Sequence, residues 1–387
     1  MFKTLLDIIK REVRILTSRQ MFRVVMICVP IGTSLFLSDL LKNGGAYRAP
    51  AAVVDLDQSA MSHSLARTLG AMQTVEIKSV YADFSEAEAA LKRGDIFGFF
   101  VIPRHFEEDA IAFAQPKLTY YCNYAYIVPA SLLFKGMKTT SLLASGAIVS
   151  TVLSSSGLGS GDIAVKLQPI VTHAHAIGNP QLHYGVYLCN SFLPGVLALM
   201  VMIMTCYVLT MEIKHNTSQE LLSTAKGSII AAVTGKLIPS TVRFILVGWT
   251  IQMTMYWLLN YPIHCHVGTM LAAMALLVIA CQAVGIFVSC VLPNPRLAIS
   301  VCSLFGMLSF SFCGFSFPME NMYDIFKVLG SMMPVRYYFL IYIDQALNGI
   351  DLYYSRVYFA VLICFVALPV LLLPRLKKNY QNPVYVP

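Results

Sequence analysis

Two pairs of histidines are the most obvious candidates for metal chemistry in this sequence. His173 and His175 flank an alanine, so both imidazoles would lie on one face of a strand, and His264 and His266 flank Cys265. Nitrogen and sulfur donors of this kind can bind zinc. Neither pair, however, is accompanied by a carboxylate or a cysteine cluster at a known ligand spacing. Solvated or packed histidines are therefore the favoured interpretation, and no metal site is predicted.

A glycine–lysine pair raises the question of nucleotide chemistry. A phosphate-binding loop needs a glycine, four further residues and then Gly-Lys-Ser/Thr, so that backbone amides can surround the phosphates. Gly235 and Lys236 are followed by Leu237 instead of a hydroxyl residue, and the earlier glycine is missing. No Ser-His-Asp arrangement stands out either. The chain is therefore predicted to bind no cofactor itself and not to be an enzyme.

The elements that carry these residues are mostly apolar. The 387 residues are 57% apolar and only 12% charged, with a mean hydropathy of +0.66, whereas a soluble chain is about 25% charged. An apolar helix needs about 20 residues to cross a bilayer. The sequence therefore predicts an α-helical polytopic membrane protein with six spans, at Met21–Leu41, Phe192–Met211, Val242–Leu259, Gly268–Leu292, Ala298–Phe315 and Val357–Leu373. The first run is too long for the core of a signal peptide, and no cleavage site follows it.

The basic residues predict the orientation of these spans. They gather before the first span, in the segment between the second and third spans, and after the last span, where Arg375, Lys377 and Lys378 stand. Basic residues mark the cytoplasmic side of a membrane. We therefore expect a multi-pass membrane protein with both termini, including the tail 374–387, in the cytoplasm. Nucleic-acid binding is not expected, because no basic cluster is interleaved with aromatic residues.

The first 20 residues form an amphipathic pattern. Phe2, Leu5, Leu6, Ile9, Val13 and Leu16 recur at helical spacing, with basic residues around them. Such a helix is typical of the membrane interface. We expect residues 1–20 to be a cytoplasmic interfacial helix rather than a simple extension of the first span.

Residues 42–190, between the first two spans, are long enough to have a core of their own. Strand patterns occur in "APAAVVDLD", "TVEIKSV", "IFGFFVI" and "KLTYYC", and helix patterns in "QSAMSHSLARTLG" and "SEAEAALKRG", the latter with Ser85 as N-cap and Gly94 as its stop. A long helix at about Val128–Leu153, a flexible break at "SSSGLGSG" and a returning strand at "KLQPIVTHA" follow. This alternation predicts an inserted extracytoplasmic α/β domain.

Two further segments belong to the five-span membrane domain 191–373. In "ELLSTAKGSIIAAVTGKLIP", Leu221, Leu222, Ala225, Ile229, Ala232 and Val233 share a helical face, which predicts an amphipathic helix between two spans. Residues 314–345 carry apolar positions together with Glu320, Asp324, Lys327, Arg336 and Asp344, a charge load that is expensive at the midplane. Two short helices that enter the membrane from outside and return would fit, and helices lying flat in an ordinary loop are the alternative.

In the order of its parts, the chain resembles the permease subunits of type-2 ABC exporters, in the branch with a large extracytoplasmic domain after the first span. The resemblance covers nearly the whole chain. It rests on the ordered set "VVDLDQSAMSHSLARTL", "GDIFGFFVIPRHFEEDA", "GNPQLHYGVYLCNSFLPGVLALM", "EIKHNTSQELLST" with "GKLIP", "CGFSFPMENM" and "MPVRYY". The sequence departs from the family's pattern at Lys214, Asn216, Gln219, Ala225 and Tyr323, which puts the detailed geometry of the loops in question.

The resemblance implies a role for the segment 212–239. In this family the cytoplasmic helix between spans two and three docks into a groove of a separate ATPase. Leu221, Leu222 and Ala225 would be the apolar anchors, and Glu212 and Glu220 could pair with basic residues of the ATPase. The alternative is that this face packs on the protein's own spans or on lipid. The residues expected in ATPase coupling are Glu212, Thr217, Glu220, Leu221, Leu222, Ala225, Gly235 and Lys236, and those of the outer re-entrant segment are Gly314, Pro318, Met322 and Pro334.

The sequence and the resemblance together predict a transmembrane permease subunit of an ATP-driven exporter for a drug, a lipid or a similar amphipathic compound. ATP and Mg²⁺ would be bound by partner ABC ATPase subunits, and a second permease copy or a paralogue would complete a dimer in the lipid membrane. A periplasmic adaptor and an outer-membrane channel are left open. The rival interpretations are an ion-coupled secondary transporter, which would need facing ionisable residues within the spans, and a lipid-modifying membrane enzyme.

Overall fold

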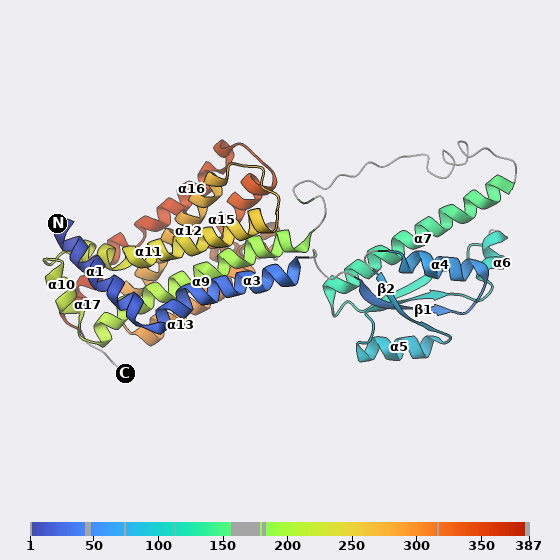
Figure 1. Ribbon diagram of the computed structural model, residues 1–387, viewed down its shortest axis with the longest axis horizontal. Coiled ribbons are helices and arrows are strands. Elements are labelled where there is room, and N and C mark those ends of the chain that lie inside the picture. The colour runs from blue at the N-terminus through green and yellow to red at the C-terminus, as the bar shows by residue number, and fades with distance from the viewer. Residues whose placement is uncertain are drawn as a thin grey trace. The chain divides into compact units, whose positions relative to one another are not determined.

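The structure is a computed structural model that describes residues 2–42, 48–72, 75–112, 114–155, 179, 183–315 and 317–383. The chain divides into two compact units (Figure 1). The first combines Met1–Lys42 with Ala176–Pro387, and the second is Asn43–His175. Each unit is described by itself below.

The first unit is built from helices, with short 3₁₀ or π segments labelled η. Its elements are α1 (Phe2–Ser18), α2 (Gln20–Arg23), η1 (Val24–Cys28), α3 (Val29–Leu41), α9 (Tyr184–Lys214), α10 (Ser218–Thr224), α11 (Ile229–Met253), η2 (Thr254–Leu258), α12 (Val267–Val291), α13 (Pro295–Phe312), η3 (Met319–Asn321), α14 (Asp324–Ser331), α15 (Pro334–Ile341), η4 (Tyr342–Leu347), α16 (Leu352–Ala367), η5 (Val370–Leu372) and α17 (Leu373–Gln381).

Among the described residues, six helices are long and apolar enough to cross a membrane, as the sequence predicts. They cover Gln20–Leu41, Tyr184–Lys214, Ile229–Leu258, Val267–Val291, Pro295–Phe312 and Leu352–Gln381. The second, third and sixth are longer than the apolar runs, because residues that flank each run at one end or both continue the helix. Residues 184–191, for example, add two turns to the start of α9.

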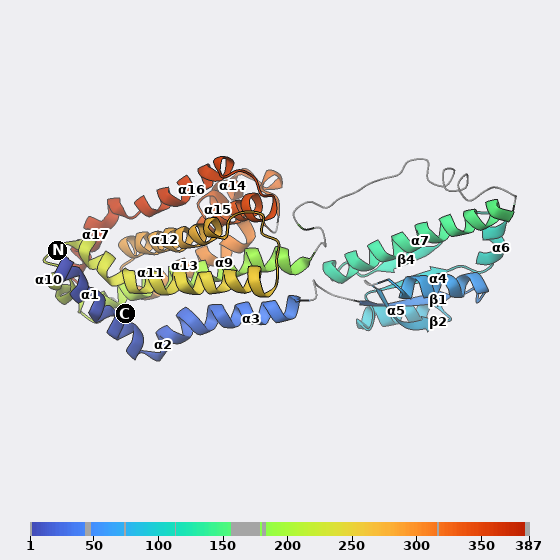
Figure 2. The same ribbon diagram turned by 45° about the horizontal axis from the view of Figure 1, so that its top comes forward.

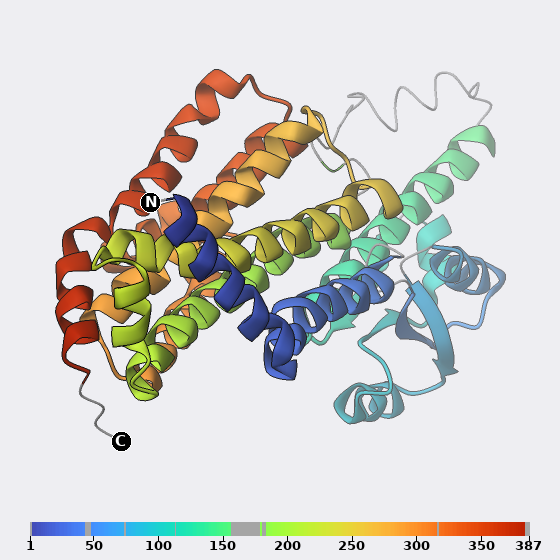
Figure 3. The same ribbon diagram turned by 60° about the vertical axis from the view of Figure 1, so that its left-hand side comes forward.

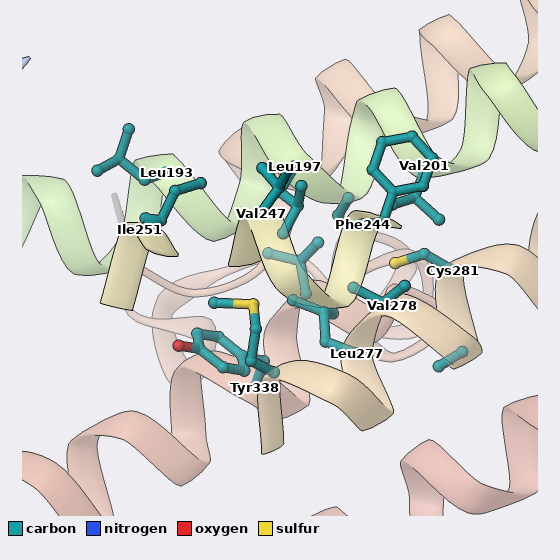
Figure 4. Close-up of a cluster of buried hydrophobic side chains, with 14 of the residues drawn as sticks. Leu193, Leu197, Val201, Phe244, Val247, Ile251, Leu277, Val278, Cys281 and Tyr338 are labelled. Carbon is teal, nitrogen blue, oxygen red and sulfur yellow. The ribbon is translucent and has the colours of Figure 1, made fainter. Parts of the chain in front are cut away.

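Helix α9 lies at the centre of this bundle and packs against α3, α11, α12 and α13. Its inner face meets α11, α12 and α15 in an apolar core, to which Leu197, Phe244, Leu277 and Tyr338 contribute (Figure 4). Helices α1, α10 and α17 gather at one end of the bundle, and α14 and α15 lie at the other (Figures 1 and 2). We call these the α10 end and the α15 end.

The second unit contains a sheet of four strands, in the order β2-β1-β3-β4. The strands are β1 (Ala49–Asp55), β2 (Val75–Tyr81), β3 (Gly98–Ile102) and β4 (Thr119–Cys122), and the helices are α4 (Ala60–Gly70), α5 (Phe84–Arg93), α6 (Phe106–Ile111) and α7 (Ile127–Ser155). β1 pairs in parallel with β2 and β3, and β4 is antiparallel to β3. Helices α4 and α7 cover one face of the sheet and α5 the other (Figure 3).

All four strands and three of the four helices of this unit lie where the sequence predicts them. Two details differ. Helix α5 begins at Phe84, so that Asp83 rather than Ser85 occupies the N-cap position. Helix α6 was not expected; its first two N–H groups donate to the carboxylate of Asp57, at 3.0 Å from Phe106 and 3.2 Å from Glu107. The expected break 154–161 lies mostly outside the described residues, and the strand 166–174 lies wholly outside them.

The predicted amphipathic helix 220–239 is wrong as a single helix. Helix α10 ends at Thr224, and Ile229 begins α11, which runs on through Pro239 into the third span. Between them Lys226 and Gly227 both have left-handed backbone, with φ of 52° and 76°. Glycine adopts this conformation without steric cost, and it turns the chain between the two helices. The spacing of the apolar residues persists because both helices face the same core.

Candidate functional site

Four charged side chains meet at the α10 end of the bundle. The Nζ atom of Lys236, in α11, lies 2.6 Å from Glu12 Oε1 of α1 and 2.6 Å from Glu212 Oε1 of α9. The guanidinium of Arg11 lies 3.1 Å from Glu212 Oε1. We call this set the charge cluster: Arg11, Glu12, Glu212 and Lys236.

The charge cluster is buried and its formal charges cancel. The side chains of Lys236, Glu12 and Glu212 are only 3%, 2% and 6% exposed. The side chain of Arg11, at the edge of the cluster, is 24% exposed. Removing a charge from water is costly unless it is paired and hydrogen-bonded. The hydroxyl of Thr217 donates to Glu212 as well. The arrangement therefore links α1, α9 and α11, and the loss of one charge would leave its partner buried and uncompensated.

The pKa of Arg11 reflects this pairing. Burial lowers the pKa of the guanidinium, but the hydrogen bond and the charge of Glu212 raise it more, so the net shift is upward. Arg11 therefore stays protonated beside Glu212. One oxygen of the cluster, Glu12 Oε2, is buried with no hydrogen-bond partner among the described residues.

The apolar face of α10 is packed into the same end of the bundle. Leu221, Leu222 and Ala225 are 0%, 7% and 2% exposed. They share a core with Ile8 of α1, Leu209 of α9, Ile229 and Ala232 of α11, and Leu376 and Tyr380 of α17. The sequence left open whether this face meets a partner or the protein's own spans. In this structure it packs on the protein's own helices, so these three residues are not accessible as anchors.

Two side chains of α10 donate hydrogen bonds to backbone carbonyls of α17. The hydroxyl of Ser218 donates to the carbonyl of Tyr380 at 3.0 Å, and the side-chain amide of Gln219 donates to the carbonyl of Gln381 at 2.8 Å. The hydroxyl of Tyr380 donates to the carbonyl of Leu209, in α9, at 2.9 Å. These contacts join α9, α10 and α17 into one packed layer.

The opposite face of α10 is polar and exposed. It presents Gln219, Glu220 and Ser223, and Lys226 follows in the turn. Beside it lies a shallow hollow of about 320 Å³, lined by Gln219, Leu222, Ser223, Gly227 and Gln381. This face, rather than the apolar one, is open to a second protein.

The eight residues expected in coupling thus fall into four places. Glu212, Thr217 and Lys236 belong to the charge cluster or contact it. Gly235 lies under α1, since a Cβ there would come within 3.0 Å of Ile8. Leu221, Leu222 and Ala225 are interior, and Glu220 is exposed.

Three contributors were missed by sequence reasoning: Arg11, Glu12 and Tyr380. The buried stripe of α1 is Thr4, Ile8, Glu12 and Leu16, at a spacing of four. That spacing places an acid between apolar residues on one helical face, and it is the signal that could have identified Glu12. The expected apolar face differs in part, since Leu6 and Val13 are exposed.

The residues expected in the outer segment lie at the α15 end. Gly314 has left-handed backbone with φ of 97°, and Arg336 Nη1 donates to the carbonyl of Cys313 at 3.2 Å. Pro318 precedes a single 3₁₀ turn that ends before Met322, and Pro334 begins α15. The segment does form two short helices, α14 and α15, and α15 packs on α9, α12 and α16. Entry of these helices into a membrane stays a prediction.

Only one of the two histidine pairs lies within the described residues. His264, Cys265 and His266 lie in the turn before α12, and His173 and His175 fall outside the described residues. Within the described ranges, no group of three or more His, Cys, Asp or Glu side chains could hold a metal ion.

Comparison with known proteins gives the family. No curated protein sequence matches the chain. The family model described as ABC-2 family transporter protein matches residues 21–373, from the first span through the last. The matched range includes α9, α10, α11 and the loop between α13 and α15, so it contains most of the site described above. The chain belongs to the ABC-2 family of transporter proteins, and is a multi-pass membrane component of a transporter.

Proposed function

We propose that this chain is the permease subunit of an ATP-driven exporter that moves a hydrophobic or amphipathic compound, such as a drug or a lipid, out across the bacterial inner membrane. The family match over residues 21–373 carries the proposal. ATP and Mg²⁺ would be bound by a separate ABC ATPase. Two permease copies, identical or paralogous, would enclose the pathway.

The exposed face of α10 is the surface that we assign to the ATPase. Gln219, Glu220 and Ser223 are its accessible side chains. A partner that pushes on this face would move α10, and the packed core beneath it would carry the motion to α1, α11 and α17. The buried apolar residues then act as the link to the spans rather than as the contact with the ATPase.

The charge cluster extends that link to α1. Glu12 and Lys236 join α1 to α11, and Glu212 joins both to the end of α9. We infer that the second and third spans and the N-terminal helix respond to the ATPase as one body. The basic residues at the α10 end, such as Lys10, Lys214 and Lys377, favour placing this end in the cytoplasm.

The second unit would then lie outside the cytoplasm. We propose that it receives cargo or docks a periplasmic adaptor that leads to an outer-membrane channel. Its own sheet and its two apolar cores give it the rigidity of an independent domain.

Neither rival function is favoured by an observation. An ion-coupled transporter would need ionisable side chains facing each other near the middle of the spans. In the described part of the first unit, the buried charged residues are Glu12, Glu212 and Lys236, and all three belong to the neutral cluster at the α10 end. A lipid-modifying enzyme would need an acid, histidine or metal set at the membrane surface. Within the described ranges, no group of three or more His, Cys, Asp or Glu side chains could hold a metal ion.

The proposal is tested by reconstituting the chain with the ABC ATPase encoded nearest to it. ATP hydrolysis and ATP-dependent movement of a fluorescent amphipathic dye would be measured in the same vesicles, with a Walker-A lysine variant of the ATPase as control. We expect hydrolysis that the dye stimulates and transport that the control lacks. Failure of any ATPase to co-purify, or dye movement driven by an ion gradient without ATP, would contradict the proposal.

A further inference from the structure

Two cysteine sulfurs lie against each other inside the helix bundle. Cys206 of α9 and Cys302 of α13 have their Sγ atoms 3.1 Å apart, and both residues are fully buried. The two helices run side by side (Figure 2). Cys206 lies eight residues before Lys214, and Cys302 seven residues after Pro295. The pair therefore joins the second and fifth spans about 12 Å from their ends at the α10 side.

Glycines bring the helices close enough for this contact. A Cβ on Gly306 of α13 would come within 2.4 Å of Leu199 Cδ1 of α9. A Cβ on Gly285 of α12 would come within 2.8 Å of Thr205 Cβ, next to Cys206. Small residues at such positions let membrane helices approach closely. The sulfur contact is thus part of a tightly packed interface on both sides of Cys206.

Polar groups of α12 fix the position of Cys206. Its Sγ lies 3.1 Å from the carbonyl oxygen of Gly285 and 3.4 Å from Ser289 Oγ. A thiol that donates to a carbonyl, with a hydroxyl beside it, has few other positions to adopt. Cys206 is therefore held facing Cys302.

We propose that Cys206 and Cys302 are a modification site at which a reversible disulfide forms. A disulfide has an S–S distance of about 2.05 Å, so the sulfurs need to approach by only about 1 Å. The two thiols lose two protons and two electrons to a small two-electron oxidant. With hydrogen peroxide, the two protons and two electrons convert it to two molecules of water while the Sγ–Sγ bond forms. A dithiol reductant reverses the reaction.

The bond would fix α9 to α13 in the arrangement seen here. Helix α9 also carries Glu212, which pairs with Lys236 of α11 in the charge cluster. The disulfide would therefore connect the fifth span to α9 and, through this pair, to α11. This inference does not depend on the cargo or on the ATPase, since it concerns the chain's own thiols.

The test uses the full chain in membranes, with a protease site inserted in the loop 260–266. Cleavage there separates the fragment that contains Cys206 from the one that contains Cys302. Membranes are treated with hydrogen peroxide or with iodine, which enters lipid, then cleaved and run on a gel without reductant. Dithiothreitol is added to a parallel sample, and the linked peptide is identified by mass spectrometry.

We expect the fragments of the natural sequence to stay linked after either oxidant and to separate with dithiothreitol. Linkage should be lost in Cys206→Ser and in Cys302→Ser, and should persist in Cys281→Ser, whose cysteine is equally buried on α12. The serine variants are conservative, and size-exclusion profiles check that they fold. Separation of the fragments after both oxidants, or linkage that survives in either serine variant, would overturn the proposal.

Discussion

At the residue scale, the charge cluster is the feature on which the α10 end most depends. Lys236 alone contacts both acids, at 2.6 Å each. A cluster of this kind adds little when compared with apolar residues of the same shape, but the loss of one partner leaves a buried charge uncompensated. Here the cluster joins helices that are distant in the sequence, since Glu12 of α1 and Lys236 of α11 are 224 positions apart.

The first prediction follows from this dependence. Lys236→Met leaves Glu12 and Glu212 buried near each other, and we expect it to lower the stability of the α10 end by about 3–5 kcal/mol. Thermal unfolding in detergent and protease sensitivity of α1 measure the change, with Lys226→Met at an exposed position as the control. Adding Glu12→Gln removes the uncompensated charge and should restore part of the loss. Equal losses in the single and double variants would show that the cluster does not act as a unit.

A second residue-scale prediction concerns Asp57 in the second unit. Partial burial raises the pKa of its carboxyl, but hydrogen bonds from Ser59, Glu107 and Phe106 lower it more, so the net pKa lies below its ordinary value. A depressed pKa stabilises the fold above the unfolded pKa, and that stability is lost as pH falls through the folded pKa. We therefore expect α6 to loosen as the pH drops below about 4.

Hydrogen exchange of the full chain measures this effect at the amides of Phe106 and Glu107. At pH 7, Asp57→Asn keeps only one acceptor oxygen and no charge, so it should weaken their protection by about 1 kcal/mol, the usual net value of one hydrogen bond. The difference from the natural sequence should shrink at acid pH, where Asp57 itself is neutral. Glu86→Gln, at an exposed position of α5, is the matched control. A difference that is the same at both pH values would mean that the charge of Asp57 does not matter.

At the element scale, the sequence was informative about which segments are helices and strands, but less so about what they contact. The six spans follow from length and composition, and the strands β1 to β4 from alternation and turn residues. The break at Lys226 and Gly227 was missed, because the apolar spacing continues across it. Helix α6 was missed because its start depends on Asp57, which is 49 positions away.

The candidate site was less predictable than the elements, because its contacts join residues that are far apart in the sequence. The family pattern pointed to Glu212, Thr217 and Lys236, and these do come together. Arg11 counted only as one of the basic residues around the apolar face of an amphipathic helix, and Glu12 was not singled out, because their partners lie about 200 residues further along the chain. The burial of Leu221 depends on α1 and α17, which no local pattern places beside it.

The third prediction tests how closely α1 packs. Gly235→Val adds side-chain atoms in a space where even a Cβ would lie 3.0 Å from Ile8, so α1 must shift. We expect a loss of about 1–3 kcal/mol, typical of overpacking, together with faster hydrogen exchange in α1. Gly268→Val, at a helical glycine with open space around it, is the control. Unchanged exchange in α1 would mean that α1 does not rest on α11 in solution.

At the scale of the whole molecule, the proposed function requires that the two ends of the first unit face opposite sides of the membrane. The α10 end carries Ser223 at its exposed face, and the α15 end carries Tyr323, which is 82% exposed. Helices α1 and α17, which lie near the two ends of the chain, are both at the α10 end (Figure 1). This orientation decides whether an ATPase in the cytoplasm can reach α10 at all.

The fourth prediction tests this orientation. In a chain whose exposed and half-exposed cysteines Cys28, Cys122, Cys265 and Cys364 are replaced by serine, Ser223→Cys and Tyr323→Cys are introduced one at a time. An impermeant maleimide added to intact cells should label Tyr323→Cys, and only after the membrane is opened should it label Ser223→Cys. The reverse pattern would invert the orientation that we propose.

The most direct test of the central claim is assembly with the ATPase when the exposed face of α10 is changed. Glu220→Arg with Ser223→Arg alters accessible side chains only, and Glu107→Arg, in the second unit, is the matched charge reversal. We predict that the double variant unfolds at the same temperature as the natural sequence, yet fails to co-purify with the ATPase and gives no cargo-stimulated ATP hydrolysis. Normal assembly and turnover of the double variant would contradict the claim that α10 receives the ATPase through this face.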